Sequence, residues 1–375
     1  MVEVILFDVD GVLLSEERYF DASALTVWEI MYSEKYLGLD HGKHKVAIQD
    51  DEIDHIRSIV FQNDDILSFY KSCGLNANWD MIYLSVAYQL IRILEHIKPT
   101  HSSDIQHWLT NEINRDILLQ IAKHVKDTEI ALDFTTLIHD FSQAEKNKAG
   151  LFQRLNEIAN ERLGVEHSIL GEKGEFWDLC EHVSQEWYVG DDFVLESTGR
   201  PSVQIGKAGF LSQEKTICPK GEIEQLFQQL TTKGIRIGIG TGRPKLETIE
   251  PFKFLNWLPY FKQENIVTAD DVLDAERSKA DGKALSKPHP YTYIHGFYHK
   301  QKSVDECLQE NLPLKNGKEL WIVGDSLADL LAARAIGATF VAVLTGLTGQ
   351  EARAEFEEYK ADYILDDVLQ LTEIL

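Results

Sequence analysis

Two acids at the end of a short apolar stretch are the first residues in this chain whose types and spacing could do chemistry. The stretch Val2-Glu3-Val4-Ile5-Leu6-Phe7 predicts a short buried strand, which Asp8, Asp10 and Gly11 follow. Side chains alternate along an extended chain, so both carboxylates are expected to point the same way where the strand ends. They repel unless a cation lies between them, which suits an oxygen-seeking metal such as Mg²⁺. A solvated strand-to-loop turn is the alternative.

Further candidate residues follow later apolar stretches. Thr241 and Gly242 come after a predicted strand at 235–239, and Asp325 and Asp329 come after another at 319–323. Each has a purely structural alternative. The Thr-Gly pair could be an ordinary turn, and the two acids could cap the helix that follows them.

Lys287 lies in the loop Ser286-Lys287-Pro288-His289-Pro290 and is a candidate cation for the same site. It could instead be a solvated loop lysine, because lysine is rarely buried. Lys279 and Lys283 are near enough in sequence to take its place.

The elements that must position these residues fall into two kinds. From Gly221 onward strands alternate with helices, including a helix at 222–232 and a strand at 339–344, which predicts a parallel α/β sheet. Such sheets bind ligands outside the carboxyl ends of their strands. Residues from about 15 to about 213 are mostly helical in pattern. The clearest helix is expected from Trp79 to Lys98, with an apolar stripe on one face and Pro99 at its end.

Four motifs in this order resemble those of the haloacid dehalogenase (HAD) superfamily, most closely its phosphoglycolate-phosphatase-like branch. They are Asp8-Val9-Asp10-Gly11-Val12, Ile239-Gly240-Thr241-Gly242-Arg243-Pro244, Lys287-Pro288-His289-Pro290 and Gly324-Asp325-Ser326-Leu327-Ala328-Asp329. The resemblance implies a Rossmann-like parallel-sheet core, residues 1–14 and 216–375. An enlarged, mainly α-helical cap with its return linker, residues 15–215, would be inserted after the first strand.

A phosphoryl-transfer site needs a nucleophile, a proton donor, a metal and a cradle for the phosphate. Asp8 is the candidate nucleophile and would form an aspartyl-phosphate, with Asp10 as general acid and base. The resemblance implies that Mg²⁺ is held by Asp8, the Asp10 backbone carbonyl and Asp325, with Asp329 in or near the first shell. Thr241, Gly242 and Lys287 would hold the phosphoryl group, and Lys287 would also offset the charge of Asp8.

We expect from these features a phosphatase that acts on a small phosphorylated metabolite. Within the superfamily, the dehalogenase and phosphonatase branches lack the second acid, so Asp10 disfavours both. A phosphosugar mutase shares the Asp-x-Asp pattern and remains an alternative, as does a non-catalytic phosphate-binding relative. Arg200 and Lys207, near the return to the core, are predicted to contact substrate from the cap.

Composition bounds the partners. The chain has 375 residues and a formal charge of −24, from 61 acidic and 37 basic residues, which argues against nucleic acid and anionic membranes. The four cysteines form no CxxC pair and are expected to be reduced thiols of a cytoplasmic protein. The N-terminus lacks a signal-peptide pattern and no apolar run is long enough to span a bilayer. We expect a monomer or a homodimer.

Overall fold

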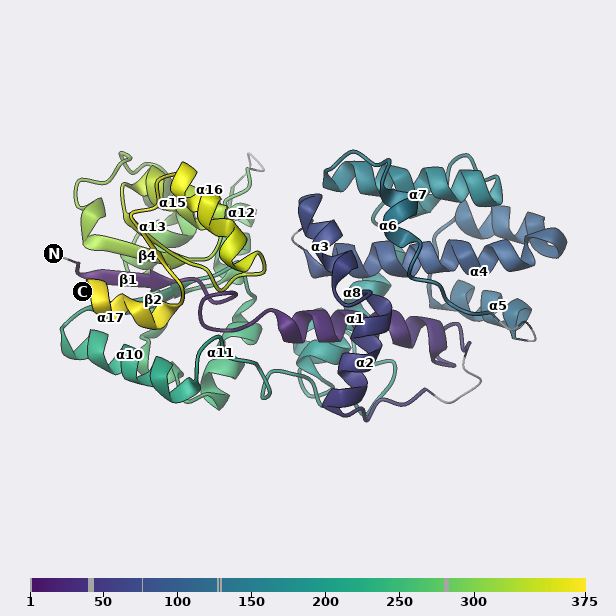
Figure 1. Ribbon diagram of the computed structural model, residues 1–375, viewed down its shortest axis with the longest axis horizontal. Helices are drawn as coiled ribbons and strands as arrows, with labels where there is room; N and C mark the ends of the chain where they lie inside the picture. Colours follow the sequence, from purple (N-terminus) through teal and green to yellow (C-terminus); the bar gives the residue numbers. More distant parts are fainter. Residues whose placement is uncertain (1, 40–43, 76, 127, 129, 280–282) are drawn as a thin grey trace. The chain divides into compact units, whose positions relative to one another are not determined.

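The computed structural model describes residues 2–39, 44–75, 77–126, 128, 130–279 and 283–375, and the chain divides into two compact units (Figure 1). The first, here the sheet unit, contains residues 1–16 together with Leu211–Leu375. The second, here the helical unit, is Glu17–Phe210. The contacts therefore place the divisions after residues 16 and 210, where the sequence suggested 14 and 215.

A six-stranded parallel sheet forms the centre of the sheet unit, with the strand order β3-β2-β1-β4-β5-β6. Leu6 of β1 lies beside Gly238 of β2 and Ile322 of β4. The carboxyl ends of these three neighbouring strands therefore meet at one edge of the sheet. The strand bounds are β1 (Val4–Phe7), β2 (Arg236–Gly240), β3 (Ile266–Val267), β4 (Leu320–Gly324), β5 (Thr339–Val343) and β6 (Tyr363–Leu365).

Apolar side chains alternate between the two faces of the sheet because each strand has a period of two. Ile5 and Phe7 of β1 pack in a core with α10, α11 and α17 on one face. Val4 and Leu6 pack with α12, α13, α15 and α16 on the other. These helices are α10 (Lys220–Thr232), α11 (Lys245–Phe254), α12 (Ala269–Arg277), α13 (Tyr291–Phe297), α15 (Leu327–Ile336), α16 (Ala352–Glu358) and α17 (Leu371–Ile374).

The predicted fold class is confirmed: a Rossmann-like parallel sheet carries a large helical insertion after its first strand. The strands expected at 235–239, 319–323 and 339–344 correspond to β2, β4 and β5 to within one residue at each end. Strand β6 was not predicted, because its three residues are too short to show a period.

The two chain segments that join the units pair with each other inside the sheet unit. Leu14 forms an antiparallel bridge with Thr216. The Ser15 N–H donates to the Lys215 carbonyl at 2.8 Å, and the Ile217 N–H donates to the Leu13 carbonyl at 3.0 Å. The segment that leaves β1 is thus hydrogen-bonded to the segment that returns to α10.

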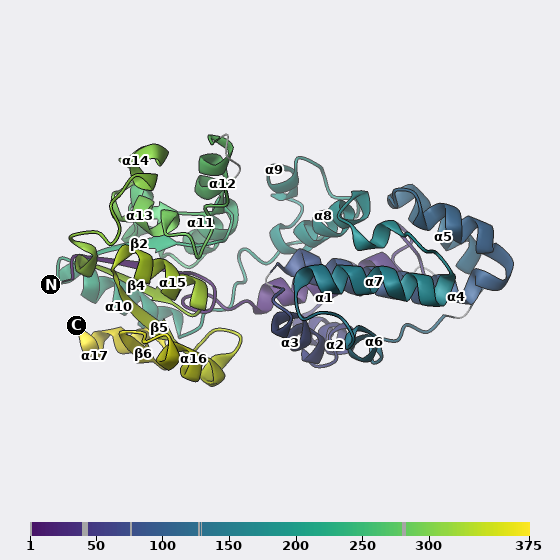
Figure 2. The ribbon, with the colours of Figure 1, turned by 90° about the horizontal axis from the view of Figure 1, so that it is seen from above.

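Helix α4 is the longest element of the helical unit and packs against α1, α7 and α8 (Figure 2). Asn147 caps α7 by accepting the Gly150 N–H at 2.8 Å, and Gly164 ends it with a left-handed φ of 77°. The helices are α1 (Glu17–Tyr32), α2 (Asp50–Val60), α3 (Asp65–Ser72), α4 (Asn78–Leu109), α5 (Arg115–Val125), α6 (Leu137–Phe141), α7 (Lys148–Leu163), α8 (Glu175–Val189) and α9 (Val194–Thr198).

The helix end expected at Pro99 lies just before a kink, at which two helical segments meet. Helix α4 continues through Pro99 to Leu109, and its backbone departs from helical geometry at His101, where φ is −128° and ψ is 29°. Proline removes one N–H and crowds the preceding turn, so it kinks a helix without always ending it. The predicted apolar stripe, from Met81 to Leu94, is buried.

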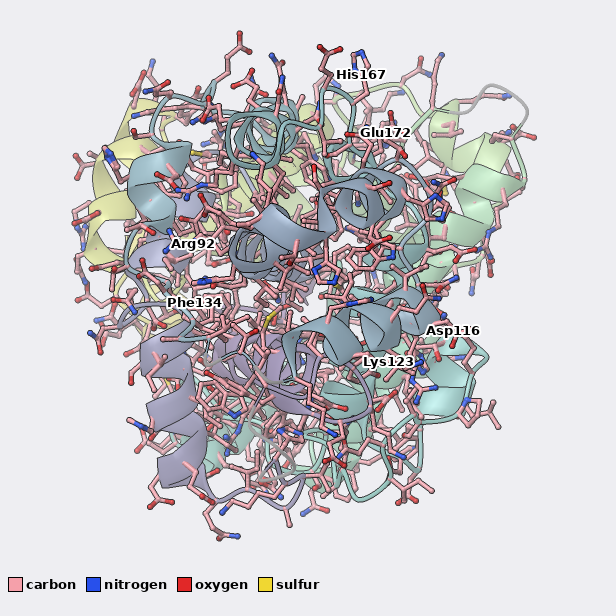
Figure 3. The ribbon with its side chains drawn as sticks, turned by 90° about the vertical axis from the view of Figure 1, so that its right-hand side faces the viewer. Arg92, Asp116, Lys123, Phe134, His167 and Glu172 are labelled. Carbon is pink, nitrogen blue, oxygen red and sulfur yellow. The ribbon has the colours of Figure 1, made fainter. Side chains whose placement is uncertain are left out.

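Polar contacts connect the helices of the helical unit to their loops. Arg92 of α4 donates to Thr136 Oγ1 at 3.1 Å and to Asp133 Oδ2 at 3.3 Å. Figure 3 shows Arg92 and Phe134 on the same side of the unit.

Among the residues described, no helix combines the length and the apolar character needed to cross a membrane.

Candidate active site

Asp8 stands directly after the central strand β1, where the sheet runs out. Its backbone N–H donates to the Val323 carbonyl at 2.9 Å, which continues the pairing of β1 with β4. The Val9 N–H donates to Asp8 Oδ1 at 2.8 Å. The Asp8 side chain is therefore held in one orientation at the edge where β1, β2 and β4 end.

Lys287 reaches this position from the loop that precedes α13. Its Nζ lies 2.7 Å from Asp8 Oδ2 and 2.8 Å from Asp329 Oδ1. Burial lowers the pKa of Lys287, but the Asp329 and Asp8 carboxylates outweigh it and raise the pKa above its usual value. Lys279 pairs with Asp305 instead, and Lys283 is exposed. Of the three lysines considered from the sequence, Lys287 is the one in contact with Asp8.

Asp325 and Asp329 bring two more carboxylates to the same place. One oxygen from each of Asp8, Asp325 and Asp329 lies within 4.8 Å of the others. Asp325 follows β4, and its Oδ2 sits against Gly11 and Gly346, where an added Cβ would come within 2.2 Å and 2.1 Å of it. Two glycines thus leave the space that this carboxylate occupies.

Asp329 belongs to the first turn of α15 and is fully buried. Its Oδ1 accepts from the Tyr293 hydroxyl at 2.6 Å as well as from Lys287, and its Oδ2 accepts from the Ser326 hydroxyl at 2.6 Å. Ser326 also caps α15 by accepting the Asp329 N–H at 3.3 Å. Asp329 is therefore fixed by three donors and in turn fixes Lys287, whatever its part in metal binding.

The electrostatics of the cluster show an excess of negative charge. Burial raises the pKa of Asp8 to about 7 against the opposing effect of Lys287, and Asp329 and Asp10 add to the rise. Burial and the charges of Asp8 and Asp329 raise the pKa of Asp325 well above its usual value. Burial also acts to raise the pKa of Asp329, but contact with Lys287 outweighs it and lowers that pKa. The Lys287 ammonium thus contacts two of the three carboxylates and acts on the third through its charge alone.

Thr241 and Gly242 follow β2, beside Asp8. Thr241 is buried, its N–H donates to the Val267 carbonyl at 3.0 Å, and its Oγ1 accepts the Arg243 N–H at 3.1 Å. Because Oγ1 acts as the acceptor in that bond, its own hydrogen is available to another acceptor. Gly242 is exposed, and a Cβ there would meet nothing within 4 Å.

Asp10 lies in the turn after Asp8 and contacts Arg243. Arg243 Nε donates to Asp10 Oδ1 at 2.7 Å, and Nη2 lies 2.6 Å from the same oxygen. The other branch of the guanidinium, Nη1, donates to Glu214 Oε1 at 2.7 Å. Arg243 belongs to the second motif, but its residue type there does not reveal this contact, and nothing in the sequence near Glu214 indicates that Glu214 binds it.

Sequence reasoning also missed Tyr293 and Ser326, which hold Asp329. Ser326 lies inside the fourth motif, directly before a helix, so its role as the helix cap could have been predicted from its position. Tyr293 could not, because only the packing of α13 against the sheet brings its hydroxyl to Asp329.

The prediction that Lys207 contacts substrate is wrong. Its side chain is fully buried in the helical unit, where it forms ion pairs with Glu29 and Glu186. A buried ammonium needs such partners, and these two carboxylates hold the Lys207 ammonium away from solvent. Arg200 is exposed and donates to the Asp178 carbonyl at 3.2 Å.

The residues present fit a divalent metal ion. Carboxylate oxygens are the ligands that Mg²⁺ prefers, and three of them converge here with a raised pKa at two. The two glycines against Asp325 leave its carboxylate room at the centre of the cluster. Asp8 and Asp325, with Asp329 beside them, would hold the ion.

Comparisons with known proteins agree with this arrangement. A family model described as HAD-hydrolase-like matches residues 285–371. A curated relative, Pyrophosphatase PpaX from Bacillus mycoides (strain KBAB4), is 32% identical over 155 residues, 41% of this chain. The chain spans 58% of that relative's length.

Solved structures were also compared with this chain, and a similar one covers its whole length. It is the X-ray structure of Northeast Structural Genomics Consortium target ZR25, which is 36% identical, with 100% of this chain and 98% of that chain covered and a TM-score of 0.90. The resemblance predicted from the four motifs is confirmed, because the HAD-hydrolase-like model matches the part of the chain that contains two of them.

Proposed function

We propose that this protein is a Mg²⁺-dependent phosphatase that hydrolyses a small phosphorylated metabolite through an aspartyl-phosphate on Asp8. The sheet unit is assigned as the catalytic core, and the helical unit as the cap domain expected from the sequence. One observation carries the proposal. A carboxylate at the end of the central strand contacts an ammonium at 2.7 Å and lies within 4.8 Å of two further acids.

The reaction has two steps that these residues can perform. In the first, a carboxylate oxygen of Asp8 attacks phosphorus, the bond to the leaving oxygen breaks, and Asp10 gives that oxygen a proton. In the second, water attacks phosphorus while Asp10 takes its proton, and the bond between phosphorus and Asp8 breaks. Inorganic phosphate leaves and both aspartates return to their starting states.

The remaining residues bind and orient the phosphoryl group. The Thr241 hydroxyl and the Gly242 N–H would donate to its oxygens, and the Lys287 ammonium would stabilise the charge that builds on them. Asp329 keeps Lys287 in place through the 2.8 Å contact. Bound Mg²⁺, held by Asp8, Asp325 and the Asp10 backbone carbonyl with Asp329 at or near it, would supply charge stabilisation and align the phosphate.

The first experiment measures phosphate release from a panel of small phosphate esters, with Mg²⁺ and with a chelator. Inorganic pyrophosphate belongs in the panel because the curated relative is named a pyrophosphatase. The matched control is Asp8→Asn, which keeps the shape of the side chain but removes the nucleophilic carboxylate. We expect metal-dependent release that the substitution abolishes.

Two results would contradict the proposal. Release that persists in Asp8→Asn would show that another group is the nucleophile. A folded wild-type protein that releases no phosphate with Mg²⁺ would not be a phosphatase of these esters. Incubation with phosphosugars would then test for isomer exchange, the activity of a mutase.

A further inference from the structure

Arg243 is buried between two carboxylates of the sheet unit. Its side chain is 1% exposed, as is that of Glu214, whereas the Asp10 side chain is 30% exposed. Nε and Nη2 both approach Asp10 Oδ1, while Nη1 donates to Glu214 Oε1 and lies 3.3 Å from the Glu247 carbonyl. The guanidinium thus contacts Asp10 on one side and Glu214 on the other.

Burying a guanidinium is costly unless its donors are satisfied, so its partners must hold it firmly. The planar group cannot turn without losing these contacts, and its orientation fixes where Asp10 Oδ1 can lie. The Arg243 backbone N–H donates to Thr241 Oγ1, so Arg243 is part of the turn after β2. Asp10 is therefore oriented from the same turn that carries the predicted phosphate-binding residues.

Glu214 lies in the segment that returns from the helical unit. That segment pairs with the one that leaves β1 beside the Leu14–Thr216 bridge, where the Ser15 N–H donates to the Lys215 carbonyl. Asp10 precedes this bridge on the segment that leaves β1, and Glu214 precedes it on the segment that returns. Arg243 joins the two segments a second time, through side chains.

We propose that Arg243 is the residue that positions Asp10 for proton transfer, and that Glu214 fixes Arg243 in turn. The proposal rests on the proposed function, because it assigns the positioning of the general acid of that reaction. Arg243 holds Asp10 Oδ1 so that the other carboxylate oxygen carries the proton toward the leaving group. Arg243 is a positioning residue and does not itself touch the reacting atoms.

This role makes a prediction that a merely structural role does not. A general acid matters most when the leaving oxygen is strongly basic and needs a proton. Phenyl phosphate and p-nitrophenyl phosphate are similar in size, but p-nitrophenolate is the weaker base and leaves without help. Loss of the Asp10 orientation should therefore slow the first ester far more than the second.

The test measures kcat/KM of the full-length protein with Mg²⁺ on both esters, for the wild type and Arg243→Lys. Lysine keeps the charge but cannot contact Asp10 and Glu214 together in the same way. We expect kcat/KM to fall about 10- to 100-fold on phenyl phosphate and less than about threefold on p-nitrophenyl phosphate. Arg334→Lys is the matched control, since Arg334 forms an ion pair with Asp362 away from this cluster, and it should change neither value.

Two further variants keep the test decisive if Arg243→Lys folds poorly. Glu214→Gln preserves shape and should give a smaller loss with the same preference for phenyl phosphate. In an Asp10→Asn background, Arg243→Lys should cause no additional loss, because a residue that acts only through Asp10 has nothing left to position.

The failures are distinguishable. Equal losses on both esters, or a further loss in the Asp10→Asn background, with an active wild type would overturn the positioning role alone. A gain in activity for Arg243→Lys would show that Arg243 holds Asp10 away from the reaction and would also overturn it. A wild-type protein inactive on both esters would contradict the proposed function itself.

Discussion

Lys287 Nζ contacts two carboxylates at once, Asp8 Oδ2 at 2.7 Å and Asp329 Oδ1 at 2.8 Å. The two acids reach it from different elements, since Asp8 follows β1 and Asp329 lies in α15. Asp329 takes two further hydrogen bonds, from Tyr293 and Ser326, so it is the more firmly held of the pair. The proposed nucleophile is thus positioned by a cation that is itself anchored on the neighbouring helix.

Replacing Lys287 by methionine should impair the chemistry more than the fold. The variant loses the charge that serves Asp8 and the phosphoryl group, so we expect kcat/KM to fall by about 10²- to 10³-fold. Phosphate release with saturating Mg²⁺ measures this. Lys279→Met is the matched control, because Lys279 pairs with Asp305 and should leave activity intact. Equal activity of the two variants would show that Lys287 has no role in the reaction.

Substituting Gly346 by alanine should weaken metal binding specifically. An added Cβ would come within 2.1 Å of Asp325 Oδ2, so the carboxylate must move. We expect the Mg²⁺ concentration for half-maximal activity to rise by about tenfold or more, a size typical of disturbing the support of a metal ligand. Gly221→Ala, in α10, is the control because its Cβ would meet nothing within 4 Å. An unchanged Mg²⁺ dependence in Gly346→Ala would argue against Asp325 as a ligand.

Mg²⁺ should stabilise the folded protein through the same acids. A ligand at 100 times its dissociation constant adds about 2.7 kcal/mol to the free energy of unfolding. Thermal unfolding with and without Mg²⁺ should show a rise in Tm for the wild type and none for Asp325→Asn. Asp274→Asn, at an exposed ion pair in α12, should keep the full response. Retention of the Mg²⁺ effect in Asp325→Asn would place the ion elsewhere.

The helical unit should show a pH-dependent stability set by Glu29. Burial raises the pKa of Glu29 to about 7, although Lys207 opposes the shift. A carboxyl whose folded pKa is raised binds its proton more tightly when folded. Its contribution to stability is therefore complete below about pH 4 and is lost as the pH rises through 7.

Glu29→Gln mimics the protonated form and should remove this dependence. Between pH 5 and pH 8 the variant should gain stability relative to the wild type, by up to about 3 kcal/mol at 1.36 kcal/mol per pKa unit. Urea unfolding at both values measures it, with the exposed Glu196→Gln as the control. A difference that stays constant between pH 5 and pH 8 would contradict the raised pKa.

Local patterns were enough to identify the elements that carry the candidate site. The alternation after residue 221 indicated a parallel sheet. The predicted acids and the Thr241-Gly242 pair lie at strand ends or in the turn or helix that follows, and Lys287 lies in the loop between α12 and α13. These features are readable because a buried strand needs an apolar run and parallel strands place their carboxyl ends together. Lys287 was also separable from Lys279 and Lys283, through the prolines that follow it.

Other features depended on side chains that meet only after folding. Lys207 looked like a loop cation, yet it is enclosed by Glu29 and Glu186, one from α1 and the other from α8. No local pattern reports such a long-range pairing.

The sequence by itself determined the family, the sheet and the identity of the acids, because each depends on residue type and near-neighbour spacing. The tertiary structure decided how these acids are held. Arg243 joins Asp10 to Glu214, residues separated by the whole helical unit in the chain, and Tyr293 reaches Asp329 from another helix. Such contacts follow from the packing of elements against a common sheet, and a linear pattern carries no record of them.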